Sequence, residues 1–370
     1  MKFTCEKNAL VSAISVASRT VAQKSTIPAL EGIYIRAGVK LTLSGYNLET
    51  GITISVDADI QETGACIMPS RLFFDIIRKL PDDTVSISVD ENFKVSIRGG
   101  ISSFSITAMS SEDYPELPEV DSEKGIDLPQ SELKAMIGGT SFAVSENQAR
   151  PIHTGCLFEV EDSSITVVAV DGYRLAPRRW KAEAPIGRTL KFVVPAAALK
   201  EAEKILGDTD ETCTFFLGSK HILFTIGEAT LVCRLLEGEF LDWRRVLPQN
   251  QPIKLAVNVA KMTDSIERVG LIISEKLKSP VRCRFGENTA DFRSVSTIGE
   301  AHDVCQIAGD GQDMEIGFNC RYLLDALRAI PDSECSLELV NGLSPIVMNP
   351  CDGSGRYSYM VLPVRLKAGE

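Results

Sequence analysis

PSRLFFDIIRKLP, at residues 69–81, is followed by two further stretches of the same pattern. They are PAAALKEAEKILG at residues 195–207 and NCRYLLDALRAIP at residues 319–331. The period is about 125 residues, which is too long for a solenoid unit and is the size of a whole domain. The chain is therefore predicted to hold three similar domains. Units joined head to tail tend to form an arc, and two arcs can close into a ring.

Each third shows the same order of expected elements: a strand, a helix, a strand meander, a second helix and further strands. Apolar residues at the helical period predict the helices, and period-two alternation predicts the strands. Asn8 is the predicted N-cap of the first helix. The expected helices span residues 7–19, 70–80, 130–142, 196–206, 260–270 and 320–329. The expected strands span residues 2–5, 32–36, 40–44, 51–56, 65–68, 84–89, 94–98, 103–108, 155–160, 164–170, 191–194 and 254–257.

Two segments punctuated by proline, DYPELP at residues 113–118 and FLDWRRVLP at residues 240–248, end the first two thirds alike. We therefore expect domains at residues 1–125, 126–252 and 253–370. An amphipathic helix must bury its apolar stripe on a sheet. The fold class is therefore predicted to be α+β, with three tandem domains that each place two helices on one face of their sheets.

Composition excludes several classes of protein. No run of about 18 apolar residues is present, so no membrane span is expected. The opening MKFTCE lacks the apolar region of a secretory signal. The ten cysteines include no CxxC pair, which argues against a zinc site. Free buried thiols in a reducing cytoplasm are the better interpretation, and neither a metal nor a cofactor is expected.

The formal net charge of −11 at first argues against nucleic acid as a partner. The positive charge, however, is concentrated on the expected helices, whose net charges are +2, +2, 0, 0, 0 and +1 in chain order. A surface built from these helices could hold a polyanion, while the acidic remainder of the chain would repel it. The plainer alternative is that solvated helix faces simply carry Lys and Arg.

The repeats, together with AVDGYRLA at residues 169–176, YMVLPVRL at residues 359–366 and the opening MKFT, resemble the bacterial DNA polymerase III beta subunit family, the sliding clamps. The resemblance covers essentially the whole chain. It implies DNA-clamp domains with sheets outside and helices inside, and a ring-shaped, head-to-tail homodimer that encircles duplex DNA. It also implies a processivity subunit that tethers the polymerase and is not an enzyme. Sliding needs weak contacts that ignore base sequence, which long cationic side chains around the hole would supply.

The resemblance also implies residues for DNA. In the family, the inner helices and the loops at their ends contact the duplex without reading its sequence. The positions that match are Lys24, Arg71, Arg78, Lys79, Lys134, Gln148, Arg150 and Lys200. The alternative for each of them is an ordinary solvated surface residue.

A second implied site is an apolar pocket between the second and third domains. In the family it takes short linear peptides from the polymerase catalytic subunit, the clamp loader and other proteins that carry clamp-binding peptides. The matching positions are His153, Val170, Gly172, Tyr173, Arg174, Leu175, Leu241, Arg245, Val246, Asn319, Tyr322, Ser344, Met360, Val361, Leu362, Pro363, Val364, Arg365 and Leu366.

The residue types at these positions suit the binding of a short peptide. Leu175, Val246, Val361 and Leu362 are expected to form an apolar cavity, and Arg174, Asn319 and Arg365 are expected to anchor the polar parts of a peptide. Pro363 cannot continue a strand ladder, so the tail is expected to fold over the pocket. The alternative for Leu175 and Val246 is ordinary core.

The sequence departs from the family pattern at three of the pocket positions. His153 stands where an aliphatic residue is common, Leu241 where Pro is usual, and Trp243 where Tyr is usual. The tail also continues past Leu366 with KAGE. These changes bear on which peptides are preferred rather than on whether the pocket exists.

A third implied site is the ring joint. Phe104 and Ile106 match the first-domain side, and Ile272 and Ile273 match the third-domain side. The alternative is that all four are core residues of their own domains. Strand pairing across the joint would also satisfy exposed sheet edges.

The sequence offers two rival functions. A hydrolase or transferase would have to use Asp171, Arg174 and His153, but no phosphate loop, HExxH or GxSxG motif accompanies them. The other rival is an arc-shaped adaptor that binds peptides but not DNA. That function predicts neutral or acidic helix faces, and the net charge of zero on three of the helices leaves it open.

Overall fold

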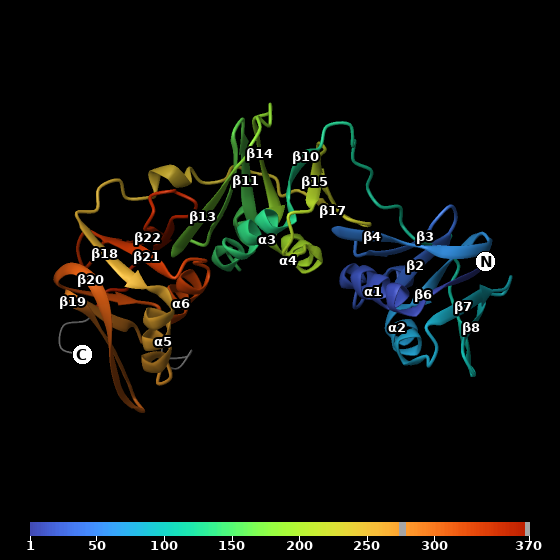
Figure 1. Ribbon diagram of the computed structural model, residues 1–370, viewed down its shortest axis with the longest axis horizontal. Helices are drawn as coiled ribbons and strands as arrows, with labels where there is room; N and C mark the ends of the chain where they lie inside the picture. Colours follow the sequence, from blue (N-terminus) through green and yellow to red (C-terminus); the bar gives the residue numbers. More distant parts are fainter. Residues whose placement is uncertain (274–278, 367–370) are drawn as a thin grey trace. The chain divides into compact units, whose positions relative to one another are not determined.

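The helices of the computed structural model follow the expected order (Figure 1). The structure describes residues 1–273 and 279–366. The helices are α1 (Lys7–Ala17), α2 (Ser70–Lys79), α3 (Gln130–Gly138), α4 (Ala196–Ile205), α5 (Val259–Gly270) and α6 (Cys320–Arg328). All six expected helices are confirmed, although α3 ends at Gly138 rather than at residue 142. The predicted cap of α1 was wrong, because the Glu6 carboxylate accepts the N–H groups of Asn8 and Ala9 at 3.0 and 2.8 Å.

Two antiparallel sheets form the first of two units, which comprises Met1–Lys134 and Ala197–Leu235. In spatial order the smaller sheet is β5 (Ala58–Glu62), β1 (Lys2–Glu6), β7 (Thr84–Val89), β8 (Lys94–Gly99) and β9 (Ser102–Thr107). The larger sheet is β10 (Ile126–Pro129), β15 (Thr212–Leu217), β16 (His221–Ile226), β17 (Ala229–Arg234), β4 (Thr50–Val56), β3 (Leu41–Tyr46), β2 (Gly32–Ala37) and β6 (Gly64–Pro69). Strand β17 pairs with β4. Strands of the first and second expected domains therefore share one sheet.

Helices α1 and α2 lie side by side and cover the core of this unit. Leu10 and Ile14 of α1 are fully buried, as are Phe73 and Ile77 of α2, and all four join one apolar cluster with Phe3 of β1. This is the burial that the helical spacing of apolar residues predicts. It leaves the opposite faces of both helices to solvent.

A single ten-stranded antiparallel sheet dominates the second unit, which comprises Ala135–Ala196 and the chain from Leu236 onward. In spatial order it is β14 (Leu190–Pro195), β11 (Gly155–Glu161), β12 (Ser164–Val170), β13 (Arg174–Lys181), β23 (Tyr359–Val361), β22 (Ile346–Pro350), β21 (Glu334–Leu339), β18 (Ile253–Asn258), β20 (Gly299–Phe318) and β19 (Val281–Ser296). Strand β13 pairs with β23. Strands of the second and third expected domains therefore also share a sheet. Helices α5 and α6 lie side by side.

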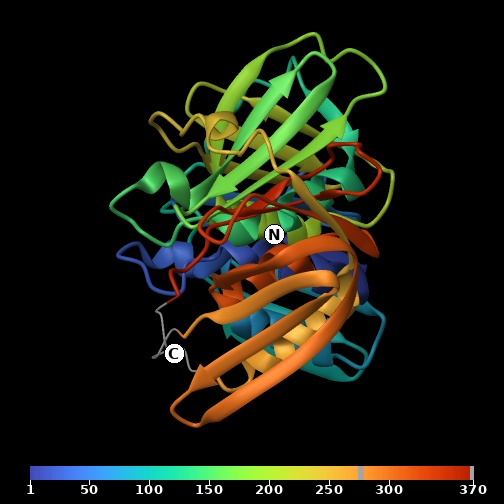
Figure 2. The ribbon, with the colours of Figure 1, turned by 90° about the vertical axis from the view of Figure 1, so that its left-hand side faces the viewer.

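The β19–β20 hairpin was not predicted from the sequence. Figure 2 shows its two long strands in orange, extending beyond the neighbouring strands of the sheet. Both strands are far longer than the usual five or six residues or so, and charged residues recur along them. A hydroxyl hydrogen bond from Ser294 to the Val269 carbonyl holds the hairpin to the last turn of α5.

Among the residues that the structure describes, no helix is long and apolar enough to span a bilayer.

Gly45 of β3 meets the end of α1 at very close range, and this contact gives a testable prediction. A Cβ atom at Gly45 would stand 2.0 Å from the Ala17 carbonyl oxygen. We expect Gly45→Ala to lower the free energy of unfolding by about 2–3 kcal/mol, because backbone must move to relieve the overlap. Gly38→Ala is the matched control, since the nearest atom to its Cβ is a flexible Arg36 side-chain atom at 3.5 Å. Equal denaturation midpoints for the two variants would contradict the prediction.

Candidate functional site

A cavity of about 660 Å³ opens in the second unit, where several of the expected peptide-site residues meet. Its lining comes from residues 144–153, from the end of β12 and the turn after it, from Leu241 and from α6. Seven expected residues line it: His153, Val170, Gly172, Tyr173, Arg174, Leu241 and Tyr322. Arg150 also lines this cavity, although the sequence placed it among the DNA contacts.

The DGYR motif forms the tight turn between β12 and β13. One carboxylate oxygen of Asp171 accepts the backbone N–H groups of Tyr173 and Arg174 at 2.8 and 3.0 Å. Gly172 takes a φ of +91°, in the left-handed region that favours glycine. The turn is therefore fixed by its own sequence, and it presents Tyr173 to solvent with 59% of that residue exposed.

Arg174 is a buried structural cation rather than a free anchor for a peptide. Its Nε donates to Asp171 at 2.9 Å, and its Nη1 donates to Asp325 of α6 at 2.6 Å. Its guanidinium also lies 4.5 Å from the centre of the Tyr322 ring, and only 7% of the side chain is exposed. Charge-assisted bonds of this kind are strong and directional. Arg174 therefore joins the turn to α6, which differs from the role expected of it.

Two aromatic rings form one wall of the cavity. Tyr173 and Tyr322 are stacked, with their ring centres 5.8 Å apart. Burial, followed by the nearby Asp171 carboxylate, raises the pKa of Tyr322 above its ordinary value. The Tyr322 phenol therefore stays neutral near pH 7, and the wall offers aromatic ring surface.

His153, which also lines the cavity, is held as a neutral ring. It meets Phe240 edge to face at 5.0 Å between ring centres. Burial, followed by the positive charge of Arg150, lowers the pKa of the imidazole. The ring therefore gains a proton only at a lower pH than an ordinary histidine. Its Nδ1 is buried, with no hydrogen-bond partner among the described residues.

The apolar floor beside the cavity is built from strands of both expected domains. Val170, Leu175, Met360 and Leu362 pack into one buried cluster. Leu175 lies opposite Met360 in the ladder, and cross-strand partners point to the same face of a sheet. Val361 is fully buried on the other face, beside Arg174. The expectation that Val361 lines the same cavity as Leu175 was therefore wrong.

The tail after β23 also departs from expectation. Pro363 does interrupt the ladder, but Val364 resumes pairing at once, with its N–H donating to the Gly317 carbonyl at 2.7 Å. Leu366 packs against Gly317 as well. Val364 and Leu366 thus lie against β20, whereas Leu362 donates its N–H to the Tyr173 carbonyl at 2.8 Å, and none of residues 362–366 is part of the cavity lining. The four residues after Leu366 lie outside the described residues.

Several other expected pocket residues have local structural partners. Asn319 caps α6 by accepting the Tyr322 N–H at 3.3 Å, and Ser344 donates its hydroxyl to Asn341 at 3.1 Å. Arg245 pairs with Asp242 at 2.9 Å while 87% of its side chain remains exposed, and 38% of Val246 is exposed. Arg365 is exposed at the end of the described chain.

Comparison with known proteins assigns the whole chain. Models of the DNA polymerase III beta subunit match three consecutive pieces: the N-terminal domain at residues 1–118, the central domain at residues 127–242 and the C-terminal domain at residues 244–365. The chain belongs to this family. It is therefore a sliding clamp, built from three tandem clamp domains, and its function is that of a processivity factor in DNA replication rather than that of an enzyme.

Individual relatives agree with this assignment. The beta sliding clamp of Staphylococcus aureus is 30% identical, and the alignment covers 99% of each chain. A putative DNA polymerase III beta subunit from Eubacterium rectale has a TM-score of 0.93 at 32% identity, covering 98% of this chain and 99% of its own. The DNA polymerase sliding clamp from Bacillus subtilis has a TM-score of 0.94 at 29% identity, covering 99% and 100%.

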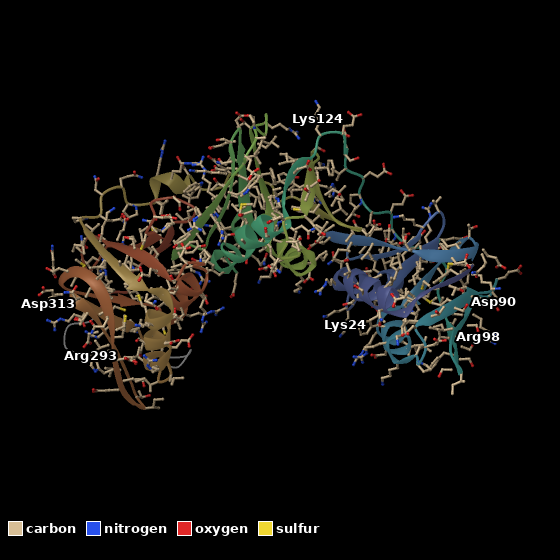
Figure 3. All side chains as sticks on the ribbon, viewed as in Figure 1. Lys24, Asp90, Arg98, Lys124, Arg293 and Asp313 are labelled. Atoms are coloured by element: carbon tan, nitrogen blue, oxygen red, sulfur yellow. The ribbon has the colours of Figure 1, made fainter. Side chains whose placement is uncertain are left out.

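The cations expected at the DNA-facing side of the clamp fall into two groups. Lys134 and Arg78 are paired, with Asp208 at 2.8 Å and with Asp75 at 3.2 Å. The others are exposed, and no ion pair to another described residue holds them: Lys24 (Figure 3), Arg71, Lys79, Arg150 and Lys200. Gln148 is exposed in the loop that also carries Arg150. No carboxylate of the described residues neutralises the charge of this second group.

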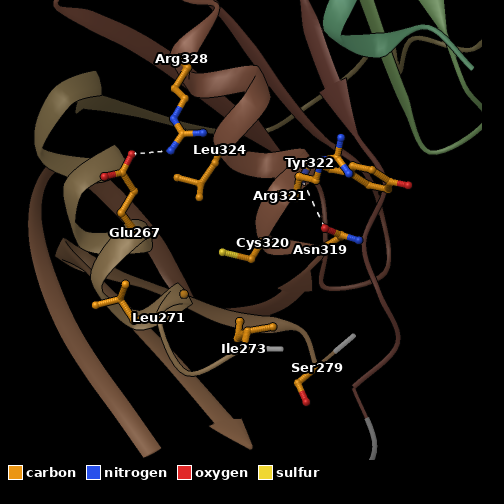
Figure 4. A pocket seen from close by; sticks show the side chains of 11 residues that line it. Glu267, Leu271, Ile273, Ser279, Asn319, Cys320, Arg321, Tyr322, Leu324 and Arg328 are labelled. Carbon is orange, nitrogen blue, oxygen red and sulfur yellow. Dashed lines mark hydrogen bonds and ion pairs between the residues drawn. The ribbon is translucent and has the colours of Figure 1, made fainter. Parts of the chain in front are cut away.

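A second cavity of the clamp, of about 700 Å³, lies between α5 and α6 in the second unit (Figure 4). Leu271, Ile273 and Leu324 supply its apolar lining, and Arg328 pairs with Glu267 at 2.7 Å across its rim. Leu271 is 83% exposed, while Ile272 and Ile273 are half-buried. The expected third-domain side of the joint is thus partly open to solvent.

The expected first-domain side of the joint lies on β9, which is the outermost strand of its sheet. Phe104 is 41% exposed there, whereas Ile106 is partly buried against the core of its own unit. An outermost strand leaves one row of backbone groups without sheet partners, and an exposed aromatic side chain on it favours association.

Proposed function

We propose that this sliding clamp encircles duplex DNA as a ring-shaped, head-to-tail homodimer and tethers the replicative polymerase to it. The observation that carries the proposal is the match of all three family domains, in order, along residues 1–365. Unpaired cations on or next to the helices support a sequence-independent grip on phosphates. The domain boundaries that we propose stay near residues 125 and 252, the second of them just before β18 begins.

We propose that the 660 Å³ cavity, with the apolar cluster beside it, docks short peptides from the polymerase catalytic subunit, the clamp loader and other clamp-binding proteins. The cavity has a mixed lining, in which the stacked tyrosine pair and Leu241 offer apolar surface beside the apolar cluster, and polar and charged residues supply partners for a peptide's polar groups. The proposed docking residues are those that line this cavity, together with Leu175, Val246, Met360 and Leu362.

We propose that the ring closes where β9 of one copy meets the α5–α6 cavity of the other. Phe104 is the exposed apolar side chain on the first side, and Leu271 and Ile273 are the apolar lining on the second. Each joint is then heterologous, and two identical joints close the ring.

Retention on DNA tests the function. After loading by a bacterial clamp loader with ATP, the clamp is expected to stay on nicked circular DNA during gel filtration and to be lost once the circle is cut. A ring that encircles DNA can slide off a linear end but cannot leave a closed circle. A clamp held only by affinity would not distinguish the two. Equal loss from circular and linear DNA would contradict encirclement and would favour an arc-shaped adaptor.

The charge on the helices gives a separate prediction. Replacing four unpaired cations by Gln should weaken binding to a short duplex and reduce the slope of log affinity against log salt by up to about 3–4, since each phosphate contact adds about 0.9. The four are Lys24, Arg71, Lys79 and Lys200. A control chain with the same change in net charge replaces Lys40, Lys181, Lys220 and Lys254. An equal change in slope for the two chains would mean that the helix cations have no special role.

A further inference from the structure

Residues 236–247, which we name the strap, cross the face of the second unit's sheet that is opposite α6. Arg174 reaches α6 from one face, so its neighbours Leu175 and Met360 point to the other. There they pack against Leu236, Phe240, Trp243 and Leu247 of the strap. Leu241, Arg245 and Val246 of the same strap are exposed. The strap therefore buries some side chains against the sheet and leaves others exposed, of which Leu241 lines the cavity of the candidate peptide site.

One side-chain cluster fastens the strap to the sheet. The indole Nε1 of Trp243 donates to Glu159 of β11 at 3.0 Å, and Nη1 of Arg244 donates to the same carboxylate oxygen at 2.6 Å. Lys191 of β14 approaches the other oxygen at 3.3 Å. Glu159 is only 8% exposed, so these bonds replace the water that a carboxylate would otherwise require.

The aromatic ring adds to this attachment. The Arg244 guanidinium lies 4.4 Å from the centre of the Trp243 ring, a geometry that favours a cation–π contact. Trp243 itself is 9% exposed and belongs to the same apolar cluster as Leu175 and Met360. Trp243 thus contacts both the Glu159 carboxylate and the apolar cluster beside the cavity.

The backbone of the strap needs this attachment. It pairs with the sheet at Leu236, whose N–H donates to the Val193 carbonyl at 3.0 Å. Further along, the N–H groups of Arg245 and Val246 donate to carbonyls within the strap itself. These bonds shape a short turn but do not tie it to the sheet. The position of that turn therefore depends on side chains.

We propose that Trp243, with Glu159 and Arg244, is a positioning residue of the peptide site: it holds the strap so that Leu241 and Val246 stand at the wall of the site. This inference rests on the proposed docking function. Leu241 lies two residues before Trp243, and Val246 lies three residues after it. The attachment at Trp243 therefore fixes the positions of both side chains. A side chain that is already in place loses less entropy when a peptide arrives, which slows dissociation of the peptide.

The test compares three variants of the full chain, with a fluorescein-labelled pentapeptide carrying Leu and Phe as the probe. Trp243→Phe keeps an aromatic ring in the cluster but removes the donor to Glu159. Trp243→Tyr restores a donor. Tyr357→Phe is the matched control, because it removes an aromatic hydroxyl that donates to the Asp332 carboxylate at 3.1 Å in the same unit.

We expect Trp243→Phe to weaken peptide affinity by about 5- to 10-fold, the equivalent of about 1–1.4 kcal/mol, mainly through faster dissociation. Trp243→Tyr should recover part of that loss, and Tyr357→Phe should bind as the unchanged chain does. Amide hydrogen exchange should accelerate at residues 240–247 in Trp243→Phe alone. Unchanged affinity in Trp243→Phe would overturn the proposal.

A double-mutant cycle separates positioning from general stability. If Trp243 acts by placing Leu241, then Leu241→Ala should cost less affinity in the Trp243→Phe background than in the unchanged chain. Additive losses would overturn the proposal. If the unchanged chain does not bind the peptide at all, the docking function fails instead. The exchange rates of the strap would still report whether Trp243 fastens it.

Discussion

A chain carrying both Phe104→Ala and Ile273→Ala is expected to run as a monomer at concentrations where the unchanged chain is a dimer. Phe104 stands exposed on the outermost strand of its sheet, and Ile273 lines the apolar cavity between α5 and α6. Truncating a central apolar residue of an interface costs about 2 kcal/mol or more, so the two changes cost about 4 kcal/mol at each joint. Because the ring has two joints, the dissociation constant of the dimer should rise about a millionfold. Mass determination by light scattering across a dilution series measures this directly.

Mixing experiments show whether the joint is heterologous. A chain with Phe104→Ala alone carries its defect on one side of the joint, and a chain with Ile273→Ala alone carries it on the other. A mixed head-to-tail dimer then has one joint with both defects and one joint with none. The dissociation constant of this mixed dimer should therefore differ from that of either single-variant homodimer. An isologous dimer contains no such undamaged joint.

The control for the double variant is Val39→Ala, at a fully exposed turn of the first unit. Its dissociation constant should equal that of the unchanged chain. A double variant that also stays dimeric, with the same sedimentation coefficient at nanomolar protein, would mean that the joint lies elsewhere.

The helices and about half of the strands of the described residues could be predicted because local physics specifies them. Apolar residues at helical spacing around Leu10 and Phe73 define buried stripes that only a sheet can cover, and both residues are fully buried. Where prediction failed, a partner distant in sequence decided the outcome. The β19–β20 hairpin, for example, is held to α5 through Ser294, and the period-two alternation of β19 is interrupted at residues 286–289, where the pairing register shifts.

The continuous sheets could not be predicted for the same reason. Strand β17 pairs with β4, and β13 pairs with β23, so each pair joins strands from different repeats. No short turn connects the two strands of either pair, so the sequence carries no local signal for the pairing. The repeat therefore gave the number of domains without showing that their sheets merge. Residue-level roles in the candidate site depended on this merging, because Leu175 and Met360 become neighbours only through it.

Arg174 and Val361 illustrate the limit within the site. Position in a motif indicated that both belong to the candidate site, but not which way each side chain points. Strand register sends Val361 to the face away from Leu175, and two carboxylates hold Arg174 toward α6. Neither Asp325 nor the register could be inferred from the DGYR motif alone. Trp243 carried a visible signal, its departure from the family pattern, but its partner Glu159 lies in another strand.

Leu241→Asp is expected to reduce affinity for a short peptide carrying Leu and Phe about 100-fold. Leu241 lines the cavity with 37% of its surface exposed, so the free clamp can hydrate a carboxylate there. A bound apolar peptide would strip that water and leave the charge without a partner, which costs about 3 kcal/mol or more. The binding loss should therefore appear without a matching loss of thermal stability. Fluorescence anisotropy and a thermal melt on the same samples measure both.

Val39→Asp places the same charge on an exposed turn of the first unit and should leave peptide affinity unchanged. Retention on nicked circular DNA should be unchanged in both variants, because encirclement depends on the joints and not on the peptide site. A clamp with Leu241→Asp that binds the peptide as the unchanged chain does would place the docking site away from the 660 Å³ cavity. A clamp that loses peptide and circular DNA together would instead indicate that this face contributes to ring closure, so the two readouts separate a misplaced pocket from a misplaced joint.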